Sequence, residues 1–305
     1  MYFVVNKMYP KMSSNGFSKL GTFVKALALL VCIGLIVITS ATAQSVTLAD
    51  NWQALFNGKD LSGWETYLDR PYSTDKTKDK ASPLGLNNDP NHVFSVTMVD
   101  GLPALRISGE TFGGINTLTE FENYHFRLEF KWGTLKWPPK LNQPRDSGLL
   151  YHSIGAHGTP MLWMESFEYQ IQEGDCGDYW GVMNVLADIS ARKNDQDKYV
   201  YQPAATPITF QDKTPVGRSC LKNPDSEKPY GQWNVLDLYC FGDTCLHMLN
   251  GKVNLVLTHT RHLVNGQPEP LTKGKIQLQS EGAEIFYRNI SIRGIKQLPA
   301  DLLQQ

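Results

Sequence analysis

The sequence predicts an all-β fold in which two antiparallel sheets pack face to face. Apolar and polar residues alternate with a period of two in many short runs. In residues 125–132, for example, Phe126 and Leu128 alternate with polar or charged neighbours, as in a half-buried strand. No long window has a helical period. So many strands in one chain bury their apolar faces by forming two packed sheets.

The predicted strands follow one another along most of the chain. Residues 166–172 repeat the alternation, and their apolar members, such as Phe167 and Tyr169, point to one face. Asn250 and Gly251 are typical of a type I′ turn between two strands. The other predicted strands are residues 93–98, 104–107, 147–153, 233–239, 246–249, 252–257, 275–279 and 284–292.

Two polar stretches, residues 68–91 and 192–231, interrupt the strands and are predicted to be long loops. No repeat of propeller or solenoid length and no linker is visible in the sequence. We therefore predict a single domain over residues 44–305, preceded by a segment that is removed.

Residues 1–43 have the pattern of a secretory signal peptide. Four lysines lead into an apolar run over residues 26–38, and Ala41-Thr42-Ala43 follows as a cleavage site. The run is shorter than the roughly 20 residues that cross a membrane, although a retained N-terminal anchor is the alternative. We expect export to the periplasm or the outside of the cell, with no membrane attachment after processing.

The composition limits the classes of function. Of the 305 residues, 41% are hydrophobic and 11% aromatic, which excludes disordered and fibrous proteins and supplies a large core. The formal net charge of -1 lacks the basic surplus that a nucleic-acid partner needs. The mature chain, without the leader lysines, is mildly acidic and suits an uncharged ligand.

Removal of the leader takes Cys32 with it and leaves four cysteines. In an oxidising compartment, disulfides are the expected state. Cys240 and Cys245 flank a tight turn between two predicted strands, so we favour their pairing, and by elimination that of Cys176 with Cys220. A zinc site is the alternative, but the spacings lack a C-x-x-C pair and a histidine at ligand spacing.

Polar residues that could carry chemistry gather on two consecutive strands between residues 145 and 180. A period of two places one set on each strand: Asp146, Gly148, Leu150 and His152 on the first, and Glu168, Gln170 and Gln172 on the second. If the two sets share a face, a carboxylate, an imidazole and amides meet there. These groups can hydrogen-bond sugar hydroxyls. The aromatic ring that stacks on a sugar would come from Trp163, Tyr179 or Trp180.

Glu168 stands out because it lies between Phe167 and Tyr169 with no Lys or Arg on its own side of the strand. His152 suits proton transfer near neutral pH, or is a structural histidine. The alternative for the whole set is an ordinary solvated sheet face. Residues 173–178 carry three carboxylates that could bind a divalent cation, but they do not match a calcium loop. We therefore predict no metal site and no required cofactor.

The sequence lacks the motifs of several common enzyme classes. It has no G-x-S-x-G elbow, no phosphate-binding glycine loop and no H-E-x-x-H pair. A conventional glycosidase needs two carboxylates that flank the bond. The next positions on the face of Glu168 are Gln170 and Gln172, which cannot act as a second acid. This weakens a laminarinase-type mechanism without excluding it.

A series of short motifs follows the chain from residue 52 to residue 290. They are W-Q-A-L-F-N-G-K-D-L-S-G-W at 52–64, D-S-G-L-L-Y-H at 146–152, E-Y-Q-I at 168–171, and closing runs at 233–234, 247–251, 274–279 and 286–290. Together they resemble the 3-keto-disaccharide hydrolase domain family over about residues 50–295. Asp146 departs from the asparagine of many members, and the stretches that carry cysteine look like features of a subgroup.

The resemblance implies a concanavalin A-like jelly roll that cleaves glycosides already oxidised to a ketone at sugar carbon 3. The ketone acidifies the hydrogen on carbon 2, so one base can remove it. The aglycone then leaves carbon 1 by β-elimination, and water adds afterwards. Mapped onto this sequence, the base is Glu168 or His152, Gln170 or His247 holds the oxyanion, and Gln279 joins the pocket. Such a substrate presupposes a separate glycoside 3-oxidoreductase.

Two alternatives stay open. The same face could grip a glycan without chemistry, as in a non-catalytic carbohydrate-binding jelly roll, or the chain could be a conventional glycoside hydrolase. In each of the three cases the expected partner is a small carbohydrate.

Overall fold

The computed structural model describes residues 48–75 and 81–304. In this part of the chain every regular element is a β-strand, except the short 3-10 helix η2 at Leu302–Gln304. All strand pairs within the two sheets are antiparallel.

The larger sheet has 12 strands. Its order is β13 (Tyr199–Tyr201), β12 (Val185–Lys193), β18 (Lys252–Val264), β17 (Thr244–Leu249), β16 (Asn234–Phe241), β8 (Tyr124–Lys136), β21 (Ala283–Gly294), β5 (Leu102–Ile107) and β4 (Phe94–Val99). Three further strands join its sides: β1 (Gln53–Ala54) pairs with β21, β14 (Pro207–Gln211) with β12, and β19 (Gln267–Pro270) with β18.

The smaller sheet has nine strands. Its order is β15 (Ser219–Cys220), β11 (Tyr179–Val182), β10 (Glu165–Gln172), β9 (Asp146–Ile154), β20 (Lys273–Ser280), β6 (Gly113–Thr117), β2 (Trp64–Leu68) and β3 (Gly85–Leu86), while β7 (Phe121–Glu122) pairs with β20. This sheet carries both strands on which polar residues were expected to gather.

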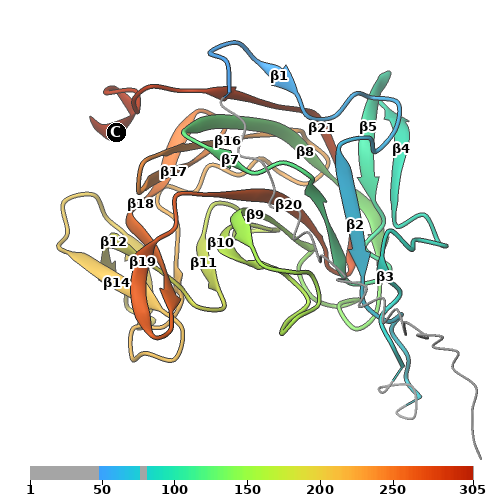
Figure 1. Cartoon of the computed structure of the whole chain (residues 1–305), viewed down its shortest axis with the longest axis horizontal. Helices are drawn as coiled ribbons and strands as arrows, with labels where there is room; N and C mark the ends of the chain where they lie inside the picture. The colour runs from blue at the N-terminus through green and yellow to red at the C-terminus, as the bar shows by residue number, and fades with distance from the viewer. Residues whose placement is uncertain (1–47, 76–80, 305) are drawn as a thin grey trace, which may run out of the picture. The chain divides into compact units, whose positions relative to one another are not determined.

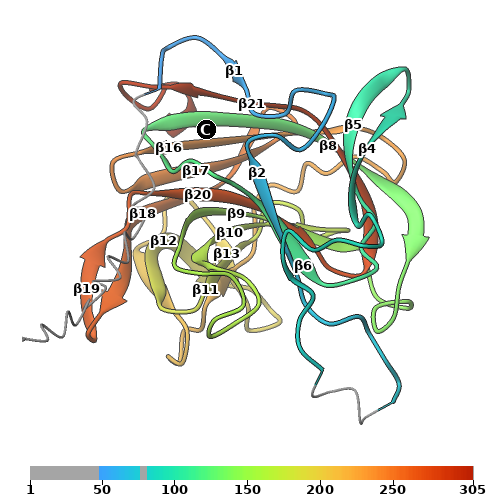
Figure 2. The same ribbon diagram turned by 45° about the vertical axis from the view of Figure 1, so that its right-hand side comes forward.

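Figures 1 and 2 show the two sheets as layers, with β8, β16 and β17 in one and β9, β10 and β20 in the other. The core fills the space between them. Phe126 and Leu128 of β8 meet Tyr151 of β9 and Phe167 and Tyr169 of β10, all fully buried. The apolar residues alternate in these strands because one side of each strand faces the core, as predicted. The predicted all-β sandwich of jelly-roll type is confirmed.

The polar stretches predicted as loops contain short strands: β3 within residues 68–91, and β13, β14 and β15 within residues 192–231. Short strands obtain their backbone hydrogen bonds from a longer neighbour, so they need little apolar alternation of their own. Strand β6 was also missed, because it begins with Gly113 and Gly114. A Cβ on Gly113 would lie 2.2 Å from the carbonyl oxygen of Tyr67, so the close approach of β2 requires glycine there.

A β-bulge interrupts β9 at His152. On the side of β10, His152 and Ser153 together oppose one residue, and regular pairing resumes at Ile154. His152 has a φ of 49°, in the left-handed region. The extra residue shifts the alternation, so the His152 ring lies between the sheets, where its centroid is 5.8 Å from that of Tyr124 on β8.

The four cysteines among the described residues are buried free thiols. Cys240 and Cys245 oppose each other across the hairpin of β16 and β17, as their spacing suggested, but no disulfide joins them. Cys176 and Cys220 are not joined either, so neither predicted disulfide is formed in this structure. The thiol of Cys176 donates to the carbonyl oxygen of Gln172, and that of Cys220 to its neighbour Leu221.

The predicted signal peptide, residues 1–43, lies outside the described residues. Within residues 48–75 and 81–304, no helix is both long enough and apolar enough to cross a membrane.

Gly274 of β20 packs against the bulge, and a Cβ there would come within 2.3 Å of the carbonyl carbon of His152. We expect Gly274→Ala to lower the free energy of unfolding by about 1–3 kcal/mol, because packed backbone must move. Urea unfolding measures this loss. Gly181→Ala is the matched control: its nearest atom is the Tyr179 hydroxyl at 3.0 Å, a side-chain atom at a longer distance and not part of the backbone. Equal losses in the two variants would contradict the expectation.

Candidate functional site

The outer face of the nine-stranded sheet, which is turned away from the 12-stranded sheet, carries most of the predicted polar set. In the register of β9 and β10, Gln170 lies opposite Gly148 and Glu168 lies opposite Leu150. Directly opposed residues of an antiparallel pair point to the same side. Glu168 and Gln170 therefore share one face with Asp146, which stands two residues before Gly148.

Gly148 forms the floor of the site. A Cβ at this position would lie 2.4 Å from Oε1 of Glu168 and 2.5 Å from Oε1 of Gln279. The two side chains thus converge above Gly148 from the neighbouring strands β10 and β20. Any larger residue would have to push them apart, so the predicted grouping of Glu168 with Gln279 depends on this glycine.

The two predicted tryptophans lie in different places: Trp180 is on a strand, and Trp163 is in the bend before β10. Trp180 of β11 is opposite Glu168 and on the same face, and the guanidinium of Arg218 lies 5.2 Å from its ring centroid. Trp163 lies beside β6, where its Nε1 donates to the carbonyl oxygen of Gly113 at 3.0 Å. Tyr179, the third candidate ring, is fully buried in the core, so it is not available to a ligand on this face.

Glu168 is an isolated buried carboxyl. Its residue is 8% exposed, and its side chain has no hydrogen-bond partner among residues 48–75 and 81–304. Burial raises the pKa of Glu168 well above its usual value, and the neighbouring carboxylates Glu281 and Asp146 raise it further. The positive charges of Arg218 and Lys140 act in the opposite direction. A carboxyl of this kind is a stronger base than an exposed one when it ionises.

Two ionisable residues that sequence reasoning missed complete the site. The Lys140 ammonium donates to Asp146 and, at 2.5 Å, to Glu281. Burial, together with Asp146, raises the pKa of Glu281 to about 7, and Lys140 opposes this shift. Burial likewise raises the pKa of Asp146. The strand of Glu168 offers no second carboxyl on this face, but Glu281 supplies one from the turn after β20.

Glu281 could have been found by extending the alternation of β20, since Gln277, Gln279 and Glu281 stand two residues apart. Lys140 lies in the connection between β8 and β9, which has no period to follow. Gln277 is a further missed residue of this face, and its Nε2 lies 3.2 Å from Nδ1 of His157.

Several acceptors on this face have no partner. Among the described residues, these buried oxygens make no hydrogen bond: Asp146 Oδ1, Gln170 Oε1, Gln277 Oε1 and Gln279 Oε1. Buried polar atoms are nearly always hydrogen-bonded, so a cluster of exceptions requires an explanation. A ligand that brings several hydroxyl donors would satisfy them together.

His152 and His247 were expected beside Glu168, and this placement is wrong for both. His152 is turned into the interior by the bulge in β9. His247 belongs to β17 of the other sheet, where its Nε2 lies 2.9 Å from the Tyr151 hydroxyl. Burial lowers the pKa of His247 to about 3. Neither imidazole can reach a ligand on the outer face.

Gln172 lies at the end of β10, directly opposite Asp146, and is half-buried. Two of the three acidic residues that follow it have side-chain partners within the protein. Glu173 pairs with Arg145 at 3.0 Å, and Asp178 accepts the backbone N–H of Lys222 at 2.8 Å. These carboxylates therefore serve to hold the loop after β10 in place.

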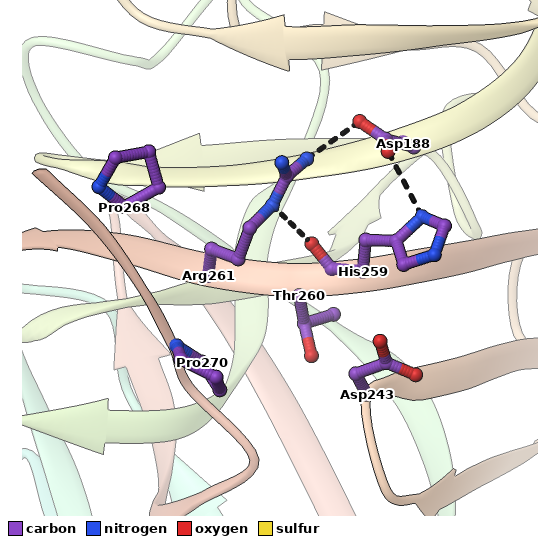
Figure 3. Close-up of a pocket in the computed structure, with 7 residues that line it drawn as sticks. All are labelled: Asp188, Asp243, His259, Thr260, Arg261, Pro268 and Pro270. Atoms are coloured by element: carbon purple, nitrogen blue, oxygen red, sulfur yellow. Dashed lines mark hydrogen bonds and ion pairs between the residues drawn. The ribbon is translucent and has the colours of Figure 1, made fainter.

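A separate hollow of about 480 Å³ lies beside β12, β18 and β19 (Figure 3). Its central carboxylate, Asp188, accepts from Arg261 at 2.6 Å, from His259 at 3.0 Å and from the Thr209 hydroxyl at 2.6 Å. None of the predicted site residues lines it. Because Asp188 is already engaged by three donors, this hollow offers less unmet hydrogen bonding than the outer face around Gly148.

The chain was compared with known proteins. Two crystal structures from Parabacteroides distasonis, each described as a "putative glycosyl hydrolase", are similar to it. One is 17% identical with a TM-score of 0.45 and covers 80% of this chain and 94% of its own. The other is 20% identical with a TM-score of 0.44 and covers 80% and 100%. A β-glucanase of Bacillus licheniformis is 10% identical with a TM-score of 0.37, over 82% and 100%.

No curated protein matches the sequence at a significant level. A model of the 3-keto-alpha-glucoside-1,2-lyase-like domain matches residues 51–293, which include every strand from β1 to β20 and nearly all of β21. The chain therefore belongs to the family of 3-keto-alpha-glucoside-1,2-lyase-like domains.

Proposed function

We propose that this protein is an exported enzyme that cleaves 3-keto-glycosides, with Glu168 as the catalytic base. The observation that carries the proposal is the Glu168 carboxyl, buried and without a hydrogen-bond partner in the described chain, above a glycine floor and beside unpartnered amide oxygens. Family membership supplies the substrate class. The site supplies the one base that this chemistry requires.

The reaction is an elimination, through an enolate, followed by a hydration. Glu168 takes the proton from carbon 2, which the neighbouring ketone acidifies, and the electron pair moves into an enolate. The Gln170 amide, with the positive charge of Lys140 and Arg218 nearby, stabilises the developing negative charge. The bond between carbon 1 and the glycosidic oxygen then breaks as a double bond forms between carbons 1 and 2. Water adds across that double bond to give the free keto-sugar.

Glu281 is suited to protonate the departing oxygen. With a pKa of about 7, it holds a proton on a large fraction of molecules at neutral pH. Glu168 takes one proton from the sugar and Glu281 gives one to the aglycone, so the net charge of the site is unchanged. Each step uses side chains alone, and a cofactor is not required.

A conventional glycoside hydrolase is the second candidate, because the structure adds a carboxyl that the sequence pattern did not reveal. Glu281 and Asp146 share the Lys140 ammonium, and Asp146 lies on the same face as Glu168, so both glutamates belong to one site. Two neighbouring carboxyls are what acid–base cleavage of an unoxidised glycoside needs. The ketone at carbon 3 separates the two mechanisms, because only elimination depends on it.

The biological setting follows from the substrate. Sugars do not carry a ketone at carbon 3 until they are oxidised, so we infer that a glycoside 3-oxidoreductase acts first. Export fits the signal-peptide pattern of residues 1–43 and places the enzyme where small glycosides enter the cell envelope.

The first test compares a 3-keto-glycoside with its unoxidised parent. We expect release of the aglycone from the keto form alone, measured by chromatography of the products. Release from both substrates at similar rates would assign the conventional hydrolase. Binding of the parent sugar without any turnover of the keto form would assign a binding module.

Glu168→Gln removes the base and keeps the shape of the side chain. We expect kcat on the keto-glycoside to fall by about 10²–10⁴-fold, because general base catalysis is lost. Glu165→Gln, on the same strand, is the matched control, since its carboxylate pairs with His262 and Asn184 at the edge of the sheet. Full activity in the Glu168 variant would remove this residue from the mechanism.

The raised pKa of Glu168 predicts the pH dependence. A base must be ionised, so kcat/KM should fall on the acid side with an apparent pKa clearly above the ordinary 4.5 of glutamate. On the alkaline side, kcat/KM should fall as Glu281 loses its proton near pH 7. Glu281→Gln should abolish only the alkaline fall. An acid limb near 4.5 in the full pH profile would contradict the assignment of the base.

A further inference from the structure

A second cluster of reactive side chains lies in the interior, apart from the outer face. It consists of His152 on β9 and of Cys240 and Cys245 on the β16–β17 hairpin. One ligand atom of each residue lies within 4.8 Å of the other two, and all three residues have 0% exposure. The imidazole comes from one sheet and both sulfurs come from the other, so the cluster bridges the two layers of the sandwich.

His152 provides an independent sign that something is bound here. Neither of its ring nitrogens makes a hydrogen bond to any described residue, although both are buried. A buried polar group without a partner costs about 1–3 kcal/mol, which folded proteins rarely leave uncompensated. The bulge and the positive φ that turn this ring inward add strain. A ligand bond to one nitrogen would account for this arrangement.

The two sulfurs lie next to each other on one hairpin. Cys240 and Cys245 are direct partners across it, and the hydroxyl of Tyr124 lies against Cys240. Zinc binds cysteine as the thiolate, so a bound ion would displace both thiol protons.

We propose that His152, Cys240 and Cys245 bind one Zn²⁺ ion that links the two sheets. Sulfur and imidazole are the ligands that structural zinc sites use. On binding, two thiol protons leave to solvent, two zinc–sulfur bonds and one zinc–nitrogen bond form, and no electron is transferred. Two thiolates and a divalent cation sum to zero, which suits a fully buried site. A monovalent copper ion would leave a net negative charge there.

A disulfide between Cys240 and Cys245 is the competing state, since it uses the same two sulfurs. It would leave both nitrogens of His152 without a partner and would not explain why the bulge aims this ring at the thiols. The zinc proposal uses all three side chains. It is independent of the proposed catalytic function, because the cluster faces the opposite side of the sheet from Glu168.

The test measures metal content in the full chain purified without chelator. We expect one zinc per chain by plasma mass spectrometry, and X-ray absorption should show two sulfurs at about 2.3 Å and one nitrogen at about 2.0–2.1 Å. Cys240→Ser and His152→Ala should each lose the zinc. Cys176→Ser is the matched control, a buried cysteine outside the cluster that should retain it.

If these variants do not fold, measurements on the wild-type protein still test the proposal. Cobalt substitution should give the absorption bands of thiolate-bound cobalt, and removal of zinc by a chelator should lower the melting temperature. Metal-free protein whose mass is lower by two hydrogen atoms would overturn the proposal in favour of the disulfide. Free thiols that take up no zinc on incubation would also overturn it, as would copper in place of zinc.

Discussion

The register between β9 and β10 is the constraint on which both clusters depend. As long as the two strands pair regularly, alternate residues point outward and form the polar set around Gly148. At His152 the bulge adds one residue, and the side chain that would have continued this set turns inward instead. One irregularity thus separates the outward polar set, where we propose catalysis, from the inward cluster of His152, Cys240 and Cys245, where we propose zinc.

The sequence predicted those parts of the fold where one face of a strand is buried. Strand β8 alternates clearly because its inner residues are buried while several outer ones are exposed or half-buried. Strand β10 alternates because its inner residues are apolar and its outer ones polar, although both sets are buried. Strand β6 carries no such signal, since it begins with two glycines: the carbonyl oxygen of Tyr67 crowds Gly113, and the side chain of Gln277 crowds Gly114. Its identity as a strand is decided by its partners, which a period of two cannot reveal.

The candidate site, too, was predicted only where strand alternation holds. Glu168, Gln170 and Gln279 meet because strand alternation holds at their positions. The prediction for His152 was wrong because the bulge in β9 depends on its pairing with β10 and β20, which alternation does not reveal. Lys140 was missed because it reaches the site from a loop. Alternation therefore locates a sheet face, but it does not locate the residues that loops place above it.

The outer face carries buried oxygen atoms that make no hydrogen bond to any described residue. Each buried acceptor without a partner costs about 1–3 kcal/mol relative to a satisfied one, and four such oxygens lie together here. A bound ligand with several hydroxyls would recover part of this free energy. Binding of such a ligand to the folded state alone would also stabilise the protein against unfolding.

The pairing of Lys140 with two carboxylates has a further consequence for how a ligand arrives. Asp146, Glu281 and Glu168 can carry three negative charges, and Lys140 and Arg218 carry two positive ones, so a single proton on Glu281 or Glu168 brings the group to neutrality. Such a group projects little long-range field into the solvent. The rate at which an uncharged sugar enters should then be nearly insensitive to ionic strength, and selection among sugars rests on short-range shape and hydrogen bonding.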